Sequence, residues 1–257
     1  MWFDSHVHLV SDELFEDFDN LVENMKQKQV VKALIICGNL LEIERALDKI
    51  EGNTMFDIAI GVHPGSVQDI SSEEYSKMMD YLSHPQVVAV GEIGLDYYWD
   101  NSTSSLQKQR LVEQIELANK HQLPIIVHLR SSVVDLKEIL IKNPVDRKGV
   151  IHCFSESIED AKDFINMGYY LGYGGITTFK NGQNVRDALL NTPITRILTE
   201  TDAPYLAPVP KRGKQNQPAY VAYTGDYIAN MLEMDTKSFQ KQIKENYYRL
   251  FNNSKSI

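Results

Sequence analysis

Residues 124–152 of the chain, PIIVHLRSSVVDLKEILIKNPVDRKGVIH, contain two short β-branched runs separated by a longer segment with helix-like apolar spacing. The runs at 124–127 and 149–152 have the length and composition of buried strands. A strand, a helix and a second strand in this order form a parallel βαβ unit with a right-handed crossover. Each run also closes on a histidine, His128 or His152, close to where the strand would end.

The same alternation of strand-like runs and helical segments extends along the whole chain. It predicts eight strands, at 2–4, 33–37, 56–61, 87–91, 124–127, 149–152, 169–173 and 196–200. Eight such units predict an α/β fold, a (β/α)₈ TIM-like barrel, and 257 residues is an ordinary length for one barrel domain. We therefore expect a single metal-dependent hydrolase barrel over residues 1–257.

Helices are predicted between the strands from their apolar spacing, for example at 11–28 and 105–121. Ser71 and Ser157 mark two helix starts, because a small polar residue there precedes acidic residues that complement a helix N-terminus. Two extra C-terminal helices are predicted after the last strand, and we expect them to pack on the outside of the barrel.

The composition limits the kinds of partner. The formal net charge of −9 argues against a broad basic surface of the kind that grips nucleic acid regardless of sequence. No stretch approaches the ~18 uncharged apolar residues of a membrane span, and the first residues lack a signal-peptide pattern. We therefore expect a cytoplasmic protein with no membrane partner. Cys37 and Cys153 lie in apolar runs and are expected to be reduced core thiols.

Residues that can bind metal ions end or follow the predicted strands, at the end of a barrel that carries active sites. His6 and His8 are two residues apart in an extended segment, so both rings face one side and can hold one cation. Glu92 emerges from an apolar strand, and its carboxylate can bridge two cations; the alternative is a salt-bridged core glutamate. His128 and His152 would then hold a second cation facing the first.

Carboxylates near the last strand complete the predicted site. Asp202 can bind a metal ion and accept a proton from water, which makes Asp202 and Glu92 the predicted catalytic residues. Asp4 is expected to orient a ligating histidine. Glu200 either supports such a ligand or pairs with a nearby lysine. His63 either contacts the substrate or a leaving group, or is structural.

Positive charge near the predicted site comes from Arg130 and from the run Lys211-Arg212-Gly213-Lys214. Arg130, Arg212 and Lys214 are candidate phosphate contacts, and the alternative is a solvated surface run. Three aromatic residues after the fourth strand offer a surface for base stacking or pack under neighbouring loops: Tyr97, Tyr98 and Trp99. The role of Asp96, beside them, stays open.

Taken in order, these motifs resemble those of the TatD-like metal-dependent deoxyribonucleases of the amidohydrolase superfamily. The resemblance covers nearly the whole chain and rests on these motifs: DSHVHL at 4–9, GVHP at 61–64, GEIGLDY at 91–97, IVH at 126–128, IHCFS at 151–155, TETDAPYL at 199–206, and RGK at 212–214 with PAYV at 218–221. The chain departs from the family's pattern at Gly65, Ser131 and Gln217.

The resemblance implies a barrel with two divalent metal ions, Mg²⁺ or Mn²⁺ in use, and Zn²⁺ or Ni²⁺ also able to occupy the site. One ion would be held by His6, His8 and Asp202 and the other by His128 and His152, with Glu92 between them. The implied reaction is hydrolysis of single-stranded or fragmented DNA by a 3′-to-5′ exonuclease, which we expect to be a monomer. Two ions suit this chemistry because they stabilise both the attacking and the leaving oxygen of a phosphodiester.

Two other classes of function stay open. The same scaffold can hydrolyse amides, esters or lactones, since an activated water attacks a carbonyl as readily as phosphorus, and an aminoacyl-RNA deacylase is one such enzyme. The basic residues near the site favour phosphate instead. The second alternative is a metal-loaded barrel without catalytic activity, against which the complete set of six ligand candidates argues.

Overall fold

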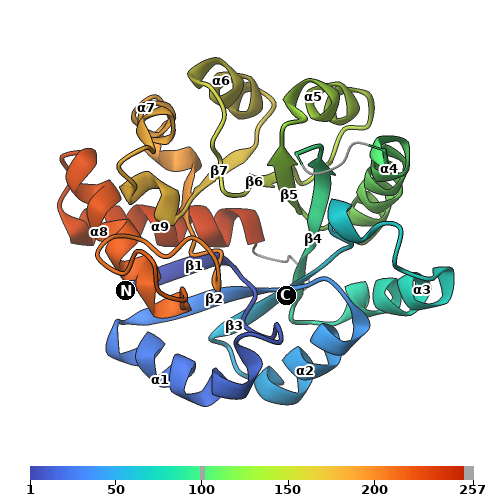
Figure 1. Ribbon diagram of the computed structural model, residues 1–257, viewed down its shortest axis with the longest axis horizontal. Helices are drawn as coiled ribbons and strands as arrows, with labels where there is room; N and C mark the ends of the chain where they lie inside the picture. The colour runs from blue at the N-terminus through green and yellow to red at the C-terminus, as the bar shows by residue number, and fades with distance from the viewer. Residues whose placement is uncertain (99–101, 252–257) are drawn as a thin grey trace.

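The computed structural model describes residues 1–98 and 102–251, and its strands form a parallel barrel surrounded by helices (Figure 1). The strands are β1 (Trp2–Val7), β2 (Val30–Cys37), β3 (Phe56–Ile60), β4 (Val87–Asp96), β5 (Ile125–Arg130), β6 (Gly149–Ile151), β7 (Tyr170–Tyr173) and β8 (Ile197–Thr199). Each strand pairs in parallel with the next along the chain, which confirms the predicted TIM-like barrel. Three strands, β1, β4 and β5, continue beyond their predicted ends.

The barrel closes where the chain just after β8 meets the end of β1. Val7 and Ala203 form a parallel bridge, and the His8 amide donates to the Ala203 carbonyl at 2.9 Å. The Asp202 amide donates to the His6 carbonyl, also at 2.9 Å. Closure therefore brings Asp202 beside His6 and His8, although most of the chain lies between them in sequence.

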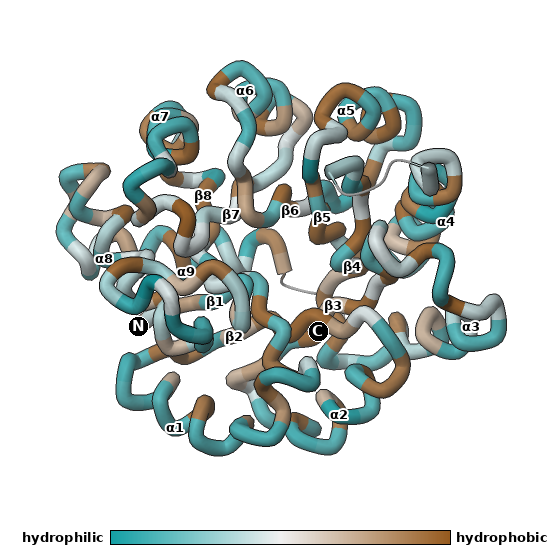
Figure 2. The backbone as a smooth tube through the Cα atoms, in the orientation of Figure 1, coloured by the Kyte–Doolittle hydropathy of each residue, from teal (hydrophilic) through white to brown (hydrophobic). Residues whose placement is uncertain are grey.

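Eight helices of the described chain form a ring outside the strands (Figure 1). They are α1 (Phe18–Gln27), α2 (Leu40–Ile50), α3 (Ser72–Asp80), α4 (Ser104–His121), α5 (Val133–Lys142), α6 (Ile158–Asn166), α7 (Gln183–Leu190) and α8 (Val221–Met231). Their outward turns are largely hydrophilic, and hydrophobic residues face the strands (Figure 2). This distribution buries an apolar stripe of each helix against the barrel.

The two predicted helix caps are confirmed, but one predicted helix begins later than expected. The Ser71 and Ser157 side chains accept from the amides of Glu74 and Asp160, as N-caps do. The helix predicted at 11–28 begins only at Phe18, after a short 3₁₀ turn. The preceding residues turn over the barrel mouth instead, and Arg45 binds the Val10 carbonyl there at 3.2 Å.

The last helix, α9 (Thr236–Phe251), lies across the starts of the strands rather than along the side of the barrel. The Tyr247 ring packs on Phe3, and its hydroxyl donates to Asp57 at 2.9 Å. The Asn246 side chain donates to the carbonyls of Ile194 and Ile197, both at 2.8 Å. Because these partners lie at or before the beginnings of strands, α9 covers the end of the barrel opposite the predicted site.

Two smaller predictions are also testable in the described chain. Cys37 and Cys153 are both free thiols, as expected. Within residues 1–98 and 102–251, none of the helices has the length and apolar character needed to cross a membrane.

Candidate metal centre

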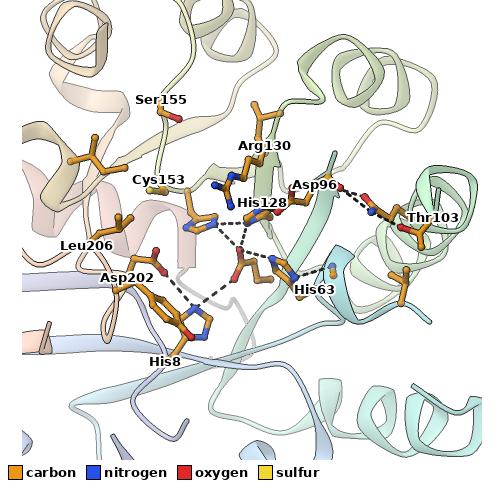
Figure 3. Close-up of a pocket in the computed structure, with 18 of the residues that line it drawn as sticks. His8, His63, Asp96, Thr103, His128, Arg130, Cys153, Ser155, Asp202 and Leu206 are labelled. Carbon is orange, nitrogen blue, oxygen red and sulfur yellow. Dashed lines mark hydrogen bonds and ion pairs between the residues drawn. The ribbon is translucent and has the colours of Figure 1, made fainter. Parts of the chain in front are cut away.

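The six predicted metal ligands meet at the carboxyl end of the barrel. Figure 3 shows three of them, His8, His128 and Asp202, around the cavity. They come from five strands or the turns just after them. His6, Glu92 and His128 lie within β1, β4 and β5, His8 and His152 directly follow β1 and β6, and Asp202 lies in the turn after β8. Five of the six, all but the fully buried His6, line a cavity of about 980 Å³. The barrel therefore places nitrogen and oxygen donors from distant parts of the sequence around one open space.

The path of β4 explains how Glu92 and His128 come together. Gly94 pairs with His128 in the register of β4 and β5, and it has a φ of +147°. A Cβ at Gly94 would lie 2.0 Å from the His128 carbonyl oxygen, so a side chain at this position would force the strands apart. This close approach lets the His128 ring lie against Glu92, where Nδ1 and Oε1 are 2.7 Å apart.

One group of potential metal-ligand atoms consists of the ring nitrogens of His6 and His8 and the carboxylate oxygens beside them. Their Nε2 atoms face each other at 3.2 Å. His6 Nε2 lies 3.3 Å from Glu92 Oε2, and His8 Nε2 lies 3.4 Å from Asp202 Oδ1. Two nitrogens bound ~2.1 Å from a tetrahedral ion would be about 3.4 Å apart. This donor set therefore fits a cation held by His6, His8 and Asp202.

A second group lies on the other side of the same glutamate. His128 Nδ1 and His152 Nε2 are 3.3 Å apart, and each lies 2.7 Å from Glu92 Oε1. The two carboxylate oxygens of Glu92 are thus divided, with Oε2 toward His6 and Oε1 toward the second histidine pair. This division is the arrangement that a bridging carboxylate needs.

The carboxylates of the centre are held in their ionised form. Burial by itself would raise the pKa of Glu92, but the neighbouring charges of His152 and His6 hold it well below its ordinary value. The pKa of Asp202 is likewise lowered, because contacts with His8 and His6 outweigh its burial. Both groups therefore offer negative charge to a cation at neutral pH.

His63 lies at the edge of the centre but presents a different kind of atom. Its Nδ1 accepts a hydrogen bond from the Gly65 amide at 2.9 Å, so the proton of the neutral ring is on Nε2. Burial lowers the pKa of His63 to about 4, which keeps the ring neutral. Nε2 lies 3.7 Å from Glu92 Oε1 and is a hydrogen-bond donor toward the cavity rather than a free ligand.

Asp96, whose role the sequence left open, contacts a predicted ligand. Its Oδ2 lies 3.1 Å from Nε2 of His128, while its Oδ1 accepts from the Tyr98 amide at 2.9 Å. Gln107 binds the backbone of Asp96 on both sides, at 2.9 and 3.0 Å. Asp96 is therefore a fixed acceptor behind His128. Its four-residue spacing from Glu92 on an extended strand was the available signal, because such residues share a face.

Asp4 and Glu200 support the centre in ways that differ from each other. The expected contact of Asp4 with an imidazole is wrong for the described chain, because Thr201 donates to both of its oxygens and the His6 amide to one. Glu200 is fully buried, with Oε1 3.8 Å from His152 Nδ1 and a hydrogen bond from the Cys153 amide. No lysine of the described residues pairs with it, and it lies beside the ligand candidate His152 at a separation beyond hydrogen-bond distance.

The predicted phosphate contacts lie at different distances from the centre. Arg130 lines the large cavity, and its guanidinium lies over the Tyr98 ring at 3.8 Å. Arg212 stacks on Phe179 at 3.9 Å, and neither it nor Lys214 is among the described residues that line the cavity. Trp99, the third aromatic residue of the predicted stacking surface, lies outside the described residues.

Comparison with known proteins agrees with this architecture. The family model described as "TatD related DNase" matches residues 3–252. The Bacillus subtilis protein named uncharacterized metal-dependent hydrolase YabD is 37% identical over 98% of this chain and 99% of its own length. The Escherichia coli metal-dependent hydrolase YcfH is 34% identical over 96% and 94%. The crystal structure of the E. coli TatD homologue YjjV superimposes with a TM-score of 0.93, at 29% identity and 98% coverage of both chains. The chain therefore belongs to the TatD family.

Proposed function

We propose that this protein is a metal-dependent phosphodiester hydrolase that acts on DNA, as a 3′-to-5′ exonuclease on single strands. The observation that carries the proposal is the division of the Glu92 oxygens between two pairs of histidines, His6 with His8 and His128 with His152. Two adjacent cation sites are typical of enzymes that hydrolyse phosphodiesters. The description of the matching family as DNases, and the names of the relatives as metal-dependent hydrolases, support the same reaction.

The geometry of the six donors supports one assignment of residues to the two ions. We assign His6, His8 and Asp202 to one ion, His128 and His152 to the other, and Glu92 to both. Divalent cations supply Lewis-acid polarisation of a phosphoryl oxygen and lower the pKa of water. We propose Mg²⁺ or Mn²⁺ as the working ions and expect Zn²⁺ or Ni²⁺ to bind as well, because imidazole nitrogens favour the later transition metals.

The remaining side chains of the cavity can act directly on water and substrate. Asp202 is ionised and lines the cavity, so it can accept the proton of the attacking water. His63 Nε2–H is a donor that can reach a phosphate or leaving-group oxygen. The Arg130 guanidinium can bind a phosphate with two hydrogen bonds. Arg212 and Lys214 would contact phosphates farther along the strand.

The first test of this function is hydrolysis of end-labelled single-stranded DNA by metal-stripped protein, with Mg²⁺, Mn²⁺ or Zn²⁺ added back. A ladder that shortens from the 3′ end only when metal is present is the expected result. Asp202→Asn keeps an oxygen ligand but cannot accept the proton. We therefore expect its kcat to fall by roughly 10²–10⁴-fold, the usual contribution of a general base.

The outcomes separate the alternatives. Unchanged turnover in Asp202→Asn, with metal content equal to that of the wild type, would remove the base assignment. Failure to cleave DNA with any of the three metals would reject the nuclease. Aminoacyl esters would then be the substrates to test on the same centre.

A further inference from the structure

A second cavity, of about 230 Å³, opens beside the metal centre. Its walls are the turn after β1, the start of α2 and the loop after β8. Two residues, His8 and Tyr205, line both this side cavity and the large one. Because His8 belongs to the candidate metal centre, a group attached to a phosphate at that centre can extend directly into the side cavity.

Tyr205 forms the wall between the two cavities and is unusually exposed for a residue in a tightly held loop. Its side chain is 52% exposed, and its ring centroid lies 6.0 Å from that of His8. The Tyr205 amide donates to the Asp202 carbonyl at 2.9 Å. The buried Asn216 side chain donates to the carbonyls of Tyr205 and Thr201, at 2.6 and 2.8 Å. Tyr205 is therefore a large aromatic surface on a backbone that is fixed from both sides.

The charges of the side cavity exclude a second phosphate. It is lined by three acidic residues, Asp12, Glu13 and Glu42, and one basic residue, Arg45. The Arg45 guanidinium is already occupied, since it binds Asp12 at 2.7 Å and the Val10 carbonyl at 3.2 Å. Asn39 Oδ1 accepts from the Glu42 amide at 2.9 Å, and Glu42 Oε2 accepts from the Gly38 amide at 2.7 Å. The Asn39 NH₂ group and the Glu13 carboxylate are the groups of this cavity that can meet the polar edge of a nucleobase, since amides and carboxylates are partners that proteins use for such edges.

We propose that the side cavity and Tyr205 bind the nucleobase of the terminal nucleotide whose phosphodiester is hydrolysed, with the base stacked on the Tyr205 ring. The volume agrees with this occupant, since it is smaller than the ~300–1,000 Å³ of pockets that enclose a whole drug-sized ligand. In this arrangement the phosphate lies at the metal centre, and the base lies on the uncharged ring of Tyr205. This inference rests on the proposed hydrolysis of DNA.

The test compares two oligonucleotides in the metal-loaded enzyme, one with ordinary terminal nucleotides and one with a tetrahydrofuran abasic residue at each end. The wild type should remove the base-bearing residue with a kcat/KM higher by roughly 5- to 150-fold, the range that one base–aromatic stack supplies. In Tyr205→Ala this ratio should fall close to one. Tyr205→Phe keeps the ring and should keep the ratio.

Tyr248→Ala is the matched control, because Tyr248 is 41% exposed and lies on α9 at the opposite end of the barrel. It should leave the ratio at the wild-type value. Equal rates of the wild type on both substrates, or a full ratio in Tyr205→Ala, would overturn the base site while hydrolysis of DNA stands. Cleavage of neither substrate would overturn the proposed function and the base site together.

Discussion

At the scale of single residues, Glu92 joins the two halves of the centre. One oxygen faces His6 and the other faces His128 and His152, so a single side chain sets the spacing of both donor groups. A glutamine at this position has the same shape, but one of its two oxygens is replaced by an NH₂ group. An NH₂ group only donates hydrogen bonds and cannot bind a cation.

We therefore predict that Glu92→Gln binds one divalent ion per chain where the wild type binds two. The measurement is elemental analysis of protein that has been saturated with Mn²⁺ or Zn²⁺ and then desalted. Glu116→Gln, an exposed site on α4, is the matched control and should retain both ions. A Glu92→Gln protein that still holds two ions would contradict the bridging role.

Asp96 supports a second prediction at this scale. By accepting from Nε2–H of His128, it leaves the lone pair of Nδ1 directed at Glu92 and His152. Asp96→Asn should lower the affinity for one of the two ions by ~10- to 100-fold, as loss of a carboxylate behind a ligating histidine typically does. Titration against a competing chelator measures both affinities.

The control for this change is Asp69→Asn, because Asp69 is exposed and lines the same cavity. It removes the same charge and should leave both affinities as they are. If Asp96→Asn lowered the thermal stability of the metal-free protein but neither affinity, Asp96 would be structural only.

At the scale of elements, the two ends of the barrel have separate tasks. The carboxyl ends of the strands carry the candidate centre, while α9 covers the opposite end. Changes at that opposite end of a barrel affect stability rather than catalysis. Asn246 is a residue of this kind, because its buried side-chain amide donates hydrogen bonds to the carbonyls of Ile194 and Ile197.

Asn246→Ala leaves these two carbonyls without their donor, and an unsatisfied buried group costs ~1–3 kcal/mol. We predict a loss of that order in the free energy of unfolding, measured by urea titration, with unchanged kcat in the protein that stays folded. Lys244→Ala, an exposed change on the same helix, should alter neither quantity. A fall in kcat at full stability would show that α9 influences the site.

At the scale of the whole molecule, the proposed DNA substrate is an anion, and the chain itself has a net charge of −9. Local positive charge must then offset the repulsion between substrate and protein, and the basic run at 211–214, in the loop after β8, is the candidate. Arg212 lies on Phe179, and the Lys211 ammonium lies 5.6 Å from the Tyr220 ring centroid. Aromatic neighbours of this kind fix cationic groups in place.

We predict that changing Lys211 and Lys214 together to glutamate weakens binding of single-stranded DNA regardless of sequence. The slope of log Kd against log salt should also become shallower by about one for each phosphate that the variant no longer neutralises. The matched control changes Lys241 and Lys244, two exposed lysines of α9, to glutamate. If both double variants had the same affinity and slope, the basic run at 211–214 would have no part in DNA binding.

Much of this architecture was predictable from sequence, because its signals are local. The period of apolar residues distinguishes strands from helices, and all eight strands are present at the predicted places. Metal-binding residue types at strand ends, such as His128 after Ile125-Ile126-Val127, identified the end of the barrel that holds the site. That these side chains bind metal and DNA stays a prediction.

The sequence by itself thus determined the order of strands and helices and the residue types at the mouth of the barrel. Tertiary structure alone decided which atoms face each other. The division of the Glu92 oxygens, the contact of Asp96 with His128 and the place of Tyr205 between two cavities depend on strand register and barrel closure. These contacts join segments far apart in the chain, so no local pattern encodes them.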